Sequence, residues 1–399
     1  MTRRVAALLF LLSVSSAAVA ADATIKIGVI GPYSGGSSPM GVSMRNGVRL
    51  AAYEINWTGG LLGRQIELVE RDDEANPERG VQIAQELVNK EKVVAVAGFI
   101  NTGVALAAQK YFQEARIPVL NNVSAGAANT RQFLPPKYPD NYVFRNSASD
   151  AIQAELVVRD AVDRRKLTRV ALFSDVTPYG VQGRDLMRAA LAKKGIQPVA
   201  EEQFKIGDSD MSAQLERARK AGAEILLCWG IGPELAAIAN DRSRLHWLVP
   251  MAGGWTLSLD NFIIAAGRNG NRARMPQTFI EEPTTSRHTT FILTYLNTYK
   301  TKRIPSAVSA AQGYDSLLLL AAAIRQANST DGPAIRAALE DLRERVSGAV
   351  TIYEHPFSKQ DHEAITANMV VTGEVRDGHI TYAYKEEERA AIVGRKEER

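Results

Sequence analysis

The sequence predicts an α/β protein built from two doubly wound parallel sheets. From residue 25 onward, short runs of β-favouring apolar residues alternate with stretches whose apolar residues recur at helical spacing. This alternation is typical of parallel strands joined by helices that cover both faces of a sheet. It runs to about residue 120 and starts again near residue 150. The 399 residues, 45% of them hydrophobic, supply enough apolar material for two cores.

The first unit is expected to follow a β-α-β-α-β-α-β order. Its strands are expected at residues 25–30, 66–69, 93–97 and 117–120. Its helices are expected at residues 40–55, 77–90 and from about 104 to 115. Pro77 follows Asn76, and because proline is favoured at the first position of a helix, the pair marks the start of the second helix.

The second unit repeats this pattern and is followed by a helical block. Its helices are expected at residues 150–163, 180–194, 211–221 and 233–242, and its strands at 169–173, 198–204, 224–229 and 247–251. Three more helices are expected at 289–300, 306–327 and 332–343, and three more strands at 350–353, 369–371 and 379–384. The charged residues 385–399 are expected to fray, as chain ends commonly do.

The joins between the units predict a hinged pair of lobes. They lie near residues 144–146, 281–283 and 347–348, and all are short. Short, repeated joins indicate that the chain crosses between the lobes more than once, which favours hinge closure over two independent domains. We assign the chain to lobes accordingly: residues 21–145 and 283–347 form the N-terminal lobe, residues 146–282 and 348–385 form the C-terminal lobe, and residues 386–399 form a charged tail.

The N-terminus has the pattern of a secretory signal peptide. Arg3 and Arg4 precede an apolar run at residues 5–12, and small residues follow, ending in Ala18-Val19-Ala20. We expect cleavage after Ala20. The run is too short to span a bilayer, and no cysteine near the cut would carry a lipid.

Composition and motifs argue against several function classes. The formal charge of +4 falls to about +2 without the signal arginines, which is too weak to indicate a nucleic-acid partner. The glycines match neither a dinucleotide nor a phosphate loop, no serine has the G-x-S-x-G frame, and the five histidines are scattered. These patterns give no signature of a catalytic, metal or cofactor site. Cys228 is the only cysteine and is expected in the core.

Polar residues follow the strands of the first unit at their carboxyl ends, where doubly wound folds bind ligands. Asn101-Thr102-Gly103 lies between a predicted strand and a helix, so free N–H groups at the helix start would attract an anion such as a carboxylate. A plain helix cap by Asn101 or Thr102 is the alternative. Residues 121–126 repeat the arrangement, and the matching strand ends of the second unit are 174–179, 230–232 and 253–255.

Four segments give the chain a resemblance to a known family. They are GVIGPYSGGSSPMG (28–41), GVRLAAYEIN (47–56), GGLLGRQIELVERDDEANP (59–77) and the segment that begins at Gly98. Together they resemble the leucine/isoleucine/valine-binding proteins, which are type I periplasmic binding proteins serving ABC importers. The resemblance extends over residues 25–384. It implies a monomeric periplasmic protein whose two lobes, joined by a three-crossover hinge, close on one small ligand and present it to an ABC permease, without catalysis or metal.

The resemblance also implies the residues that contact the ligand. Thr102 and Gly103 match one carboxylate-binding segment, beside Asn101 at the same strand end, and Val123, Ser124 and Ala125 match a second. Met40, Tyr179 and Ile231 match positions that contact the ligand in the family. Gly254 and Trp255, at the strand end after residues 247–251, are expected to complete the pocket around the apolar part of the ligand.

One departure from the family pattern bears on the ligand. Amino-acid binders of this family usually carry an acid after the strand that corresponds to residues 247–251, where it pairs with the ligand ammonium. This chain has no acid at residues 251–255, and a buried ammonium without a partner is costly. The sequence thus favours an apolar or aromatic carboxylate. Asp175 could instead hold an ammonium, or it could cap its own turn. A branched-chain or other amino-acid receptor, a sensory binding module and an enzyme on a similar scaffold remain alternatives.

Overall fold

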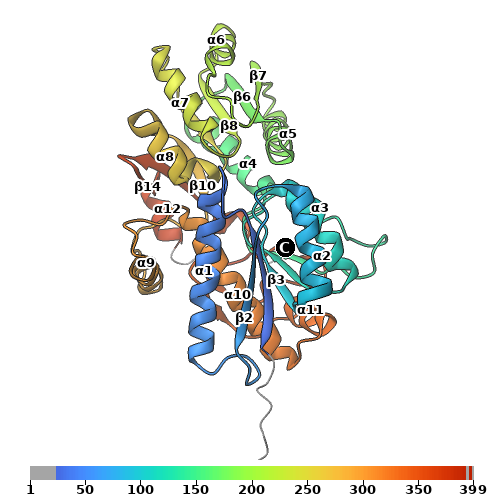
Figure 1. Cartoon of the computed structure of the whole chain (residues 1–399). Helices are drawn as coiled ribbons and strands as arrows, with labels where there is room; N and C mark the ends of the chain where they lie inside the picture. Colours follow the sequence, from blue (N-terminus) through green and yellow to red (C-terminus); the bar gives the residue numbers. More distant parts are fainter. Residues whose placement is uncertain (1–23, 392–394, 398–399) are drawn as a thin grey trace, which may run out of the picture.

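The computed structural model describes residues 24–391 and 395–397 of the chain. Two lobes lie one above the other, each built around its own sheet (Figure 1). The predicted signal peptide, residues 1–20, lies outside the described residues.

The sheet of the first lobe is wholly parallel, with the strand order β2-β1-β3-β4-β5. Its strands are β1 (Ile25–Gly31), β2 (Ile66–Asp72), β3 (Ala95–Ala97), β4 (Val119–Asn121) and β5 (Val143–Arg145). Its helices are α1 (Ser38–Trp57), α2 (Pro77–Glu86) continued by a π-helical turn (Leu87–Glu91), α3 (Thr102–Glu114), α9 (Ser286–Tyr299), α10 (Ala307–Ala327) and α11 (Gly332–Glu340).

Helices cover both faces of this sheet, and the side chains of β1 are accordingly buried on both faces. Ile27 and Val29 belong to the apolar cluster that includes α1 and α10, whereas Ile30 belongs to the cluster of α2 and α3. Helices α1 and α10 cross closely at Gly47 and Gly313. A Cβ on Gly47 would lie 2.0 Å from the main-chain oxygen of Ala310, and a Cβ on Gly313 would lie 2.3 Å from that of Met44. Helix α10 is the one described helix long and apolar enough to span a membrane, but 83% of its apolar window is buried within the protein, as in a core helix.

The sheet of the second lobe has the strand order β14-β13-β10-β9-β8-β6-β7. Strands β6 (Val170–Asp175), β7 (Ala200–Phe204), β8 (Ile225–Trp229), β9 (Met251–Gly253) and β10 (Arg274–Gln277) are parallel, and β13 (Val371–Arg376) and β14 (His379–Tyr382) add antiparallel pairs at one edge. The helices are α4 (Asp150–Val158) with a π-helical turn (Arg159–Arg164), α5 (Pro178–Ala192), α6 (Ser212–Lys220), α7 (Glu234–Arg244), α8 (Asp260–Ala266) and α12 (Lys385–Ala391). The 3₁₀ turns are Trp255–Ser258 and Gly267–Gly270.

Within the described residues the chain passes between the two sheets at three places: between β5 and α4, between β10 and α9, and between β12 and β13. Strands β11 (Val346–Ser347) and β12 (Ile352–Tyr353) form a small antiparallel ribbon. The ribbon spans residues 347–348, where the sequence predicts the third crossing, and the chain enters the second sheet only at β13. The assignment of residues to lobes otherwise stays a prediction.

Several local expectations are corrected by the structure. The strand expected at 247–251 is β9, which begins only at Met251; Pro250 and the left-handed His246 (φ 51°) keep the preceding residues irregular. Residues 385–391 were expected to fray but form α12, whose Glu387 is buried against the sheet. The carboxylate of Glu387 accepts the main-chain N–H of Thr372 and pairs with Arg164, which fastens α12 to the lobe.

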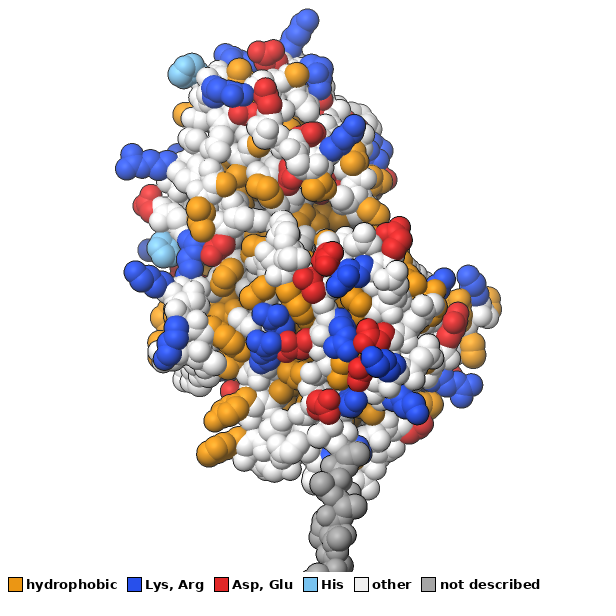
Figure 2. Space-filling view, in the orientation of Figure 1, with side chains coloured by type: hydrophobic (Ala, Val, Ile, Leu, Met, Phe, Trp, Pro, Cys, Tyr) orange, Lys and Arg blue, Asp and Glu red, His pale blue; other side chains and the backbone are white. Residues whose placement is uncertain are grey.

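The face shown in Figure 2 carries positive and negative side chains side by side over the first lobe. Ion pairs of the first lobe include Arg49 with Glu70 at 2.6 Å and Arg71 with Glu86 at 2.8 Å. Opposite charges that are paired in this way leave no single-sign patch on this face of the first lobe.

Candidate ligand site between the lobes

The carboxyl ends of the two sheets face each other, and the lobes are in contact there. Asn261 of α8 donates a hydrogen bond from Nδ2 to the main-chain oxygen of Gly36, 2.8 Å away across the interface. A Cβ on Gly103 would lie 3.4 Å from Pro178 of the opposite lobe. The described conformation is therefore a closed one. Of the strand-end residues predicted to bind the ligand, Thr102, Ser124, Tyr179 and Trp255 are buried, and Asn101 and Gly103 are half-buried.

The first lobe presents an uncapped helix start. Helix α3 begins at Thr102, and the side chain of Asn101 makes no capping bond; its Nδ2 donates instead to Ser37 Oγ at 3.1 Å. Asn101 is thus not the plain helix cap that was the alternative. The first N–H groups of α3 have no side-chain acceptor, and the Thr102 hydroxyl, on a residue 1% exposed, has no hydrogen-bond partner. This arrangement is suited to an anion.

The second carboxylate segment is held mainly by bonds within its own lobe. Ser124 donates its main-chain N–H to Phe99 O at 2.7 Å, and its hydroxyl accepts from Asn129 Nδ2. Its amide is therefore committed to the protein, while the hydroxyl keeps its own proton to donate. The segment nevertheless lies against Thr102, because a Cβ on Gly126 would fall 2.4 Å from the Thr102 methyl group.

The second lobe presents two buried ring donors without partners. Tyr179, at the start of α5, is 5% exposed; its hydroxyl lies near the Thr256 and Trp255 side chains but meets hydrogen-bond geometry with neither. Its ring lies 5.8 Å from that of Trp229, whose Nε1 is also unpartnered. A Cβ on Gly254 would lie 2.7 Å from the Tyr179 hydroxyl, so the glycine leaves room for this group. The sequence reading assigned Trp229 to a core strand and missed its polar edge at the strand end.

Asp175 is engaged by the protein itself. Its Oδ1 accepts the main-chain N–H of Thr177 at 2.8 Å, and its Oδ2 accepts the main-chain N–H of Ile231 at 3.1 Å. Burial raises the pKa of the Asp175 carboxyl, and these hydrogen bonds oppose that rise. Asp175 could hold a ligand ammonium or cap its own turn, and its contacts are those of a cap. They also connect the loop after β6 to the loop after β8.

Asp150 is an acid at the site that sequence reasoning missed. It opens α4 directly after the first crossing, is fully buried, and its Oδ2 has no partner. Burial raises the pKa of the Asp150 carboxyl to about 7, and the charge of Arg145 acts in the opposite direction. The Asp150 charge reaches the Tyr179 hydroxyl, whose pKa is raised first by burial and next by this carboxylate. The sequence does offer a signal for Asp150 as a site residue, since it is an acid at a predicted helix start directly after a predicted crossing between the lobes.

The apolar residues predicted to cover the ligand are buried in both lobes. Met40 and Trp255 are 3% and 6% exposed, and both belong to an apolar cluster that runs through the two lobes. Other members of that cluster near the strand ends are Val123, Ala125, Tyr179, Trp229 and Ile231. The main-chain N–H of Trp255 donates to Gln153 Oε1 at 3.2 Å, which links it to the helix that carries Asp150.

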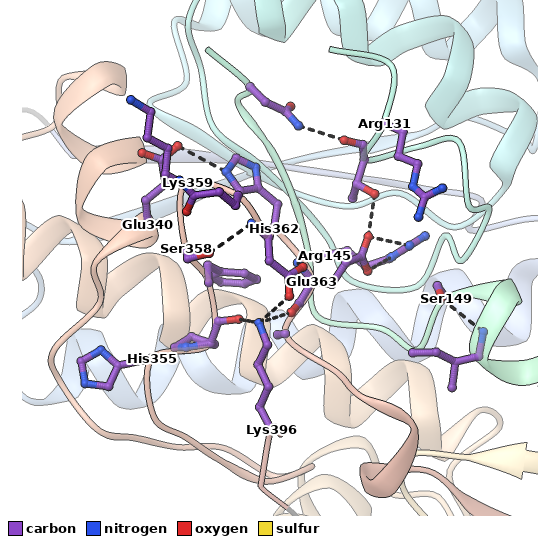
Figure 3. Close-up of a pocket in the computed structure, with 18 of the residues that line it drawn as sticks. Arg131, Arg145, Ser149, Glu340, His355, Ser358, Lys359, His362, Glu363 and Lys396 are labelled. Atoms are coloured by element: carbon purple, nitrogen blue, oxygen red, sulfur yellow. Dashed lines mark hydrogen bonds and ion pairs between the residues drawn. The ribbon is translucent and has the colours of Figure 1, made fainter. Parts of the chain in front are cut away.

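A separate groove of about 1330 Å³ lies at the hinge and is lined by none of the residues predicted to contact the ligand. Figure 3 shows it, with Arg145 and Glu363 meeting near Lys396. Among the described residues, no group of three or more His, Cys, Asp or Glu side chains is arranged to hold a metal ion. Burial raises the pKa of the Cys228 thiol to about 12, so it is inert as a nucleophile.

Comparisons with known proteins agree with this architecture. A family profile described as "Periplasmic binding protein" matches residues 24–379. The Leu/Ile/Val-binding protein homolog 3 of Brucella melitensis is 28% identical, over 84% of this chain and 89% of that protein. A periplasmic binding protein type 1 structure from Bordetella pertussis Tohama I superposes with a TM-score of 0.79 at 29% identity, covering 90% of this chain and 99% of that one. A solute-binding protein of an ABC transporter from R. palustris, solved with 4-hydroxybenzoate, has a TM-score of 0.77 at 20% identity, covering 90% and 95%.

Proposed function

Since this chain belongs to the periplasmic binding protein family, we propose that it is the solute receptor of an ABC importer and binds one apolar α-amino acid between its lobes. The observation that carries the choice of ligand is Asp150, a fully buried carboxylate whose Oδ2 has no partner in the protein. We propose that Asp150, at the start of α4, takes the place of the acid that the sequence lacks after β9. This role weakens the argument for an amino-free acid, which rested on that missing residue.

The proposed ligand is held at two charged ends. The start of α3 and the Thr102 hydroxyl receive the ligand carboxylate, where each hydrogen bond to a charged group contributes roughly 1.5–3 kcal/mol. Asp150 receives the ammonium group. A buried ion is tolerated when it is paired, so the zwitterion and the two protein groups compensate each other.

The apolar part of the ligand is covered by the rings and aliphatic side chains of the shared cluster. Tyr179, Trp229 and Trp255 come from the second lobe, and Met40 comes from the first. Their contact requires the closed conformation, in which Asn261 reaches Gly36. The closed conformation thus distinguishes the ligand-bound receptor from the empty one. We propose that an inner-membrane permease recognises the surface of the closed form. The receptor would act as a periplasmic monomer. A sensory partner that reads the same closed form is the alternative.

A second candidate ligand is an amino-free aromatic carboxylate. It is favoured by the raised pKa of Asp150, about 7, because near neutral pH a large share of empty sites would carry a protonated Asp150. A protonated carboxyl can donate a hydrogen bond to a carboxylate or phenol oxygen. This candidate predicts tighter binding at pH 5.5 than at pH 8, whereas the amino acid, which needs an ionised Asp150, predicts the reverse.

A thermal-shift screen of ligand-stripped, refolded protein lacking residues 1–20 tests the proposal. The panel pairs leucine with 4-methylpentanoate and phenylalanine with 3-phenylpropanoate, because the members of each pair differ only in the ammonium group, and adds benzoate. A native-state ligand at hundredfold excess over its Kd stabilises the protein by roughly 2.7 kcal/mol. We expect the amino acids to raise the Tm and their amino-free partners not to. Stabilisation by the amino-free acids alone would support the second candidate, and no response to any small carboxylate or amino acid would contradict the receptor function.

A further inference from the structure

We infer that Arg145 is a positioning residue that fixes the ligand loop, residues 122–126, to the hinge. The inference rests on the proposed function, because it concerns the geometry of that same site. Arg145 is the last residue of β5, is 1% exposed, and does not belong to the segments predicted to touch the ligand. Its guanidinium lies where the ligand loop, the first crossing and the third crossing meet (Figure 3).

On one side, the guanidinium holds the ligand loop by two main-chain oxygens. Nη1 donates to Ala125 O at 2.9 Å and to Gly126 O at 2.8 Å. Ala125 O also accepts the main-chain N–H of Asp150 at 2.8 Å. Gly126 packs directly on the Thr102 side chain. Arg145 therefore bonds to the two residues, Ala125 and Gly126, that contact the two ends of the proposed ligand site, Asp150 and Thr102.

On the other side, the guanidinium holds the third crossing through a bidentate ion pair. Nε and Nη2 donate to the two carboxylate oxygens of Glu363, each at 2.7 Å. The main chains pair as well, since Arg145 N donates to His362 O at 2.9 Å and Ala364 N donates to Arg145 O at 2.8 Å. The Thr130 hydroxyl donates to Glu363 at 2.6 Å.

This geometry makes the ligand loop and the hinge a single unit. The planar guanidinium serves two carbonyls and two carboxylate oxygens at once, which a lysine ammonium with three donors in a compact head cannot reproduce. A lysine at position 145 would keep the positive charge beside Glu363 but would release at least one carbonyl of the ligand loop. The loop would then be free to shift against Thr102 and Asp150.

A matched control separates positioning from general stability. Arg242 of α7 is also buried, 6% exposed, and it also donates to two main-chain oxygens, Val249 O at 2.6 Å and Asn269 O at 2.7 Å. Both partners belong to segments of the second lobe outside the ligand site. Arg242→Lys therefore removes the same kind of hydrogen bonds from a buried guanidinium but leaves the contacts of the ligand loop unchanged.

The experiment compares Arg145→Lys with Arg242→Lys in the full mature protein. We expect both variants to lower the Tm without ligand, and only Arg145→Lys to weaken leucine binding, by tenfold or more in isothermal titration. We also expect ligand-free hydrogen exchange of the peptide covering residues 146–153 to speed up in Arg145→Lys only, because the Asp150 N–H is bonded to the released carbonyl. Glu363→Gln, which keeps the shape of the partner and removes its charge, provides a second variant with the same expected pattern if Arg145→Lys does not fold.

The outcomes are distinguishable. Affinity losses of equal size in the two lysine variants, or unchanged exchange at residues 146–153, would overturn the positioning role. If wild-type protein binds no member of the panel, the proposed function fails, and the exchange measurement still decides whether Arg145 orders the loop.

Discussion

The main-chain N–H of Asp150, the first residue of α4, donates to the main-chain oxygen of Ala125 at 2.8 Å, so the first crossing of the hinge is bonded to the ligand loop. This bond orients the helix start that carries the Asp150 side chain. The carboxylate consequently lies near Tyr179 of the second lobe while its backbone is attached to the first. A ligand ammonium at Asp150 would hold the two lobes at their junction.

We expect Asp150→Asn to reverse the ligand preference. Asparagine preserves the size of the side chain but leaves a ligand ammonium without a counter-charge, so leucine should bind more weakly by about 2–5 kcal/mol. 4-Methylpentanoate has no ammonium to pair with Asp150, so it should bind the variant more tightly than it binds the wild-type protein. Isothermal titration of both compounds measures the difference. Asp73→Asn is the control, because Asp73 is likewise a fully buried carboxylate with an unpartnered oxygen but lies at the end of β2. Leucine binding that survives Asp150→Asn would remove Asp150 from the site.

Asp73 itself leads to a prediction for stability against pH. Burial raises its pKa to about 7, from an ordinary value of 3.8 in the unfolded chain. Between those two pH values the unfolded state has lost the proton while the folded state still holds it, so raising the pH through this window favours unfolding. Above pH 7 both states are ionised and the penalty is constant.

Asp73→Asn should therefore raise the Tm at pH 8 and change it little at pH 4. Asparagine keeps the acceptor that Asp73 Oδ1 offers to Ala75 N at 2.9 Å and removes only the charge. Each pKa unit corresponds to about 1.4 kcal/mol, so a gain on the order of 1 kcal/mol or more is expected at pH 8. Thermal melts at a series of pH values give the answer. The exposed Glu216→Gln serves as the control and should leave the curve unchanged. An equal effect of Asp73→Asn at both pH values would contradict the titration.

The buried strands were predictable because they are apolar on both faces. β1, β6 and β8 each contain a run that only a covered parallel sheet explains, and all three were found. β5 and β10 were missed because they have three and four residues and carry arginine, proline or glutamine. Their pairing is set by neighbouring strands, which a local pattern does not reveal.

The ligand site was predictable only where its residues follow a strand directly. Thr102 and Tyr179 lie at strand ends, and the resemblance to the binding-protein family singled out the same positions. That resemblance is confirmed by the family match. Asp150 and Arg145 were missed because the sequence shows only a helix start at Asp150 and a short connection at Arg145. Their contacts with the ligand loop depend on how the chain crosses between the lobes. Which groups bind the ligand stays a prediction.

The C-terminal residues 395–397 lead to a prediction about the hinge. Lys396 Nζ donates to the main-chain oxygens of Pro356 and Glu363, both at 2.6 Å, and forms an ion pair with Asp361 at 3.2 Å. Lys396→Met keeps the aliphatic stem and removes these bonds, so the free energy of unfolding should fall by about 1–3 kcal/mol. Urea titration of the variant measures the loss. Lys359→Met, an exposed lysine on the same crossing, is the control and should be neutral. A neutral Lys396→Met would show that these bonds do not stabilise the hinge.

The hydroxyl of Tyr179 should serve the ligand and not the fold. It is buried without a hydrogen-bond partner, and a buried hydroxyl that bonds to nothing costs free energy. Tyr179→Phe should therefore leave the Tm of the ligand-free protein unchanged or higher, while weakening leucine binding. Tyr353→Phe is the control, because the Tyr353 hydroxyl is also buried but donates a hydrogen bond to Asp315 Oδ2 at 2.9 Å. That variant should lose about 1–3 kcal/mol of stability and keep its affinity. Thermal melts give the Tm of each variant, and isothermal titration gives the affinity of each variant for leucine. If Tyr179→Phe lowers the ligand-free Tm and spares binding, its hydroxyl stabilises the fold, and the second lobe contacts the ligand through its other residues.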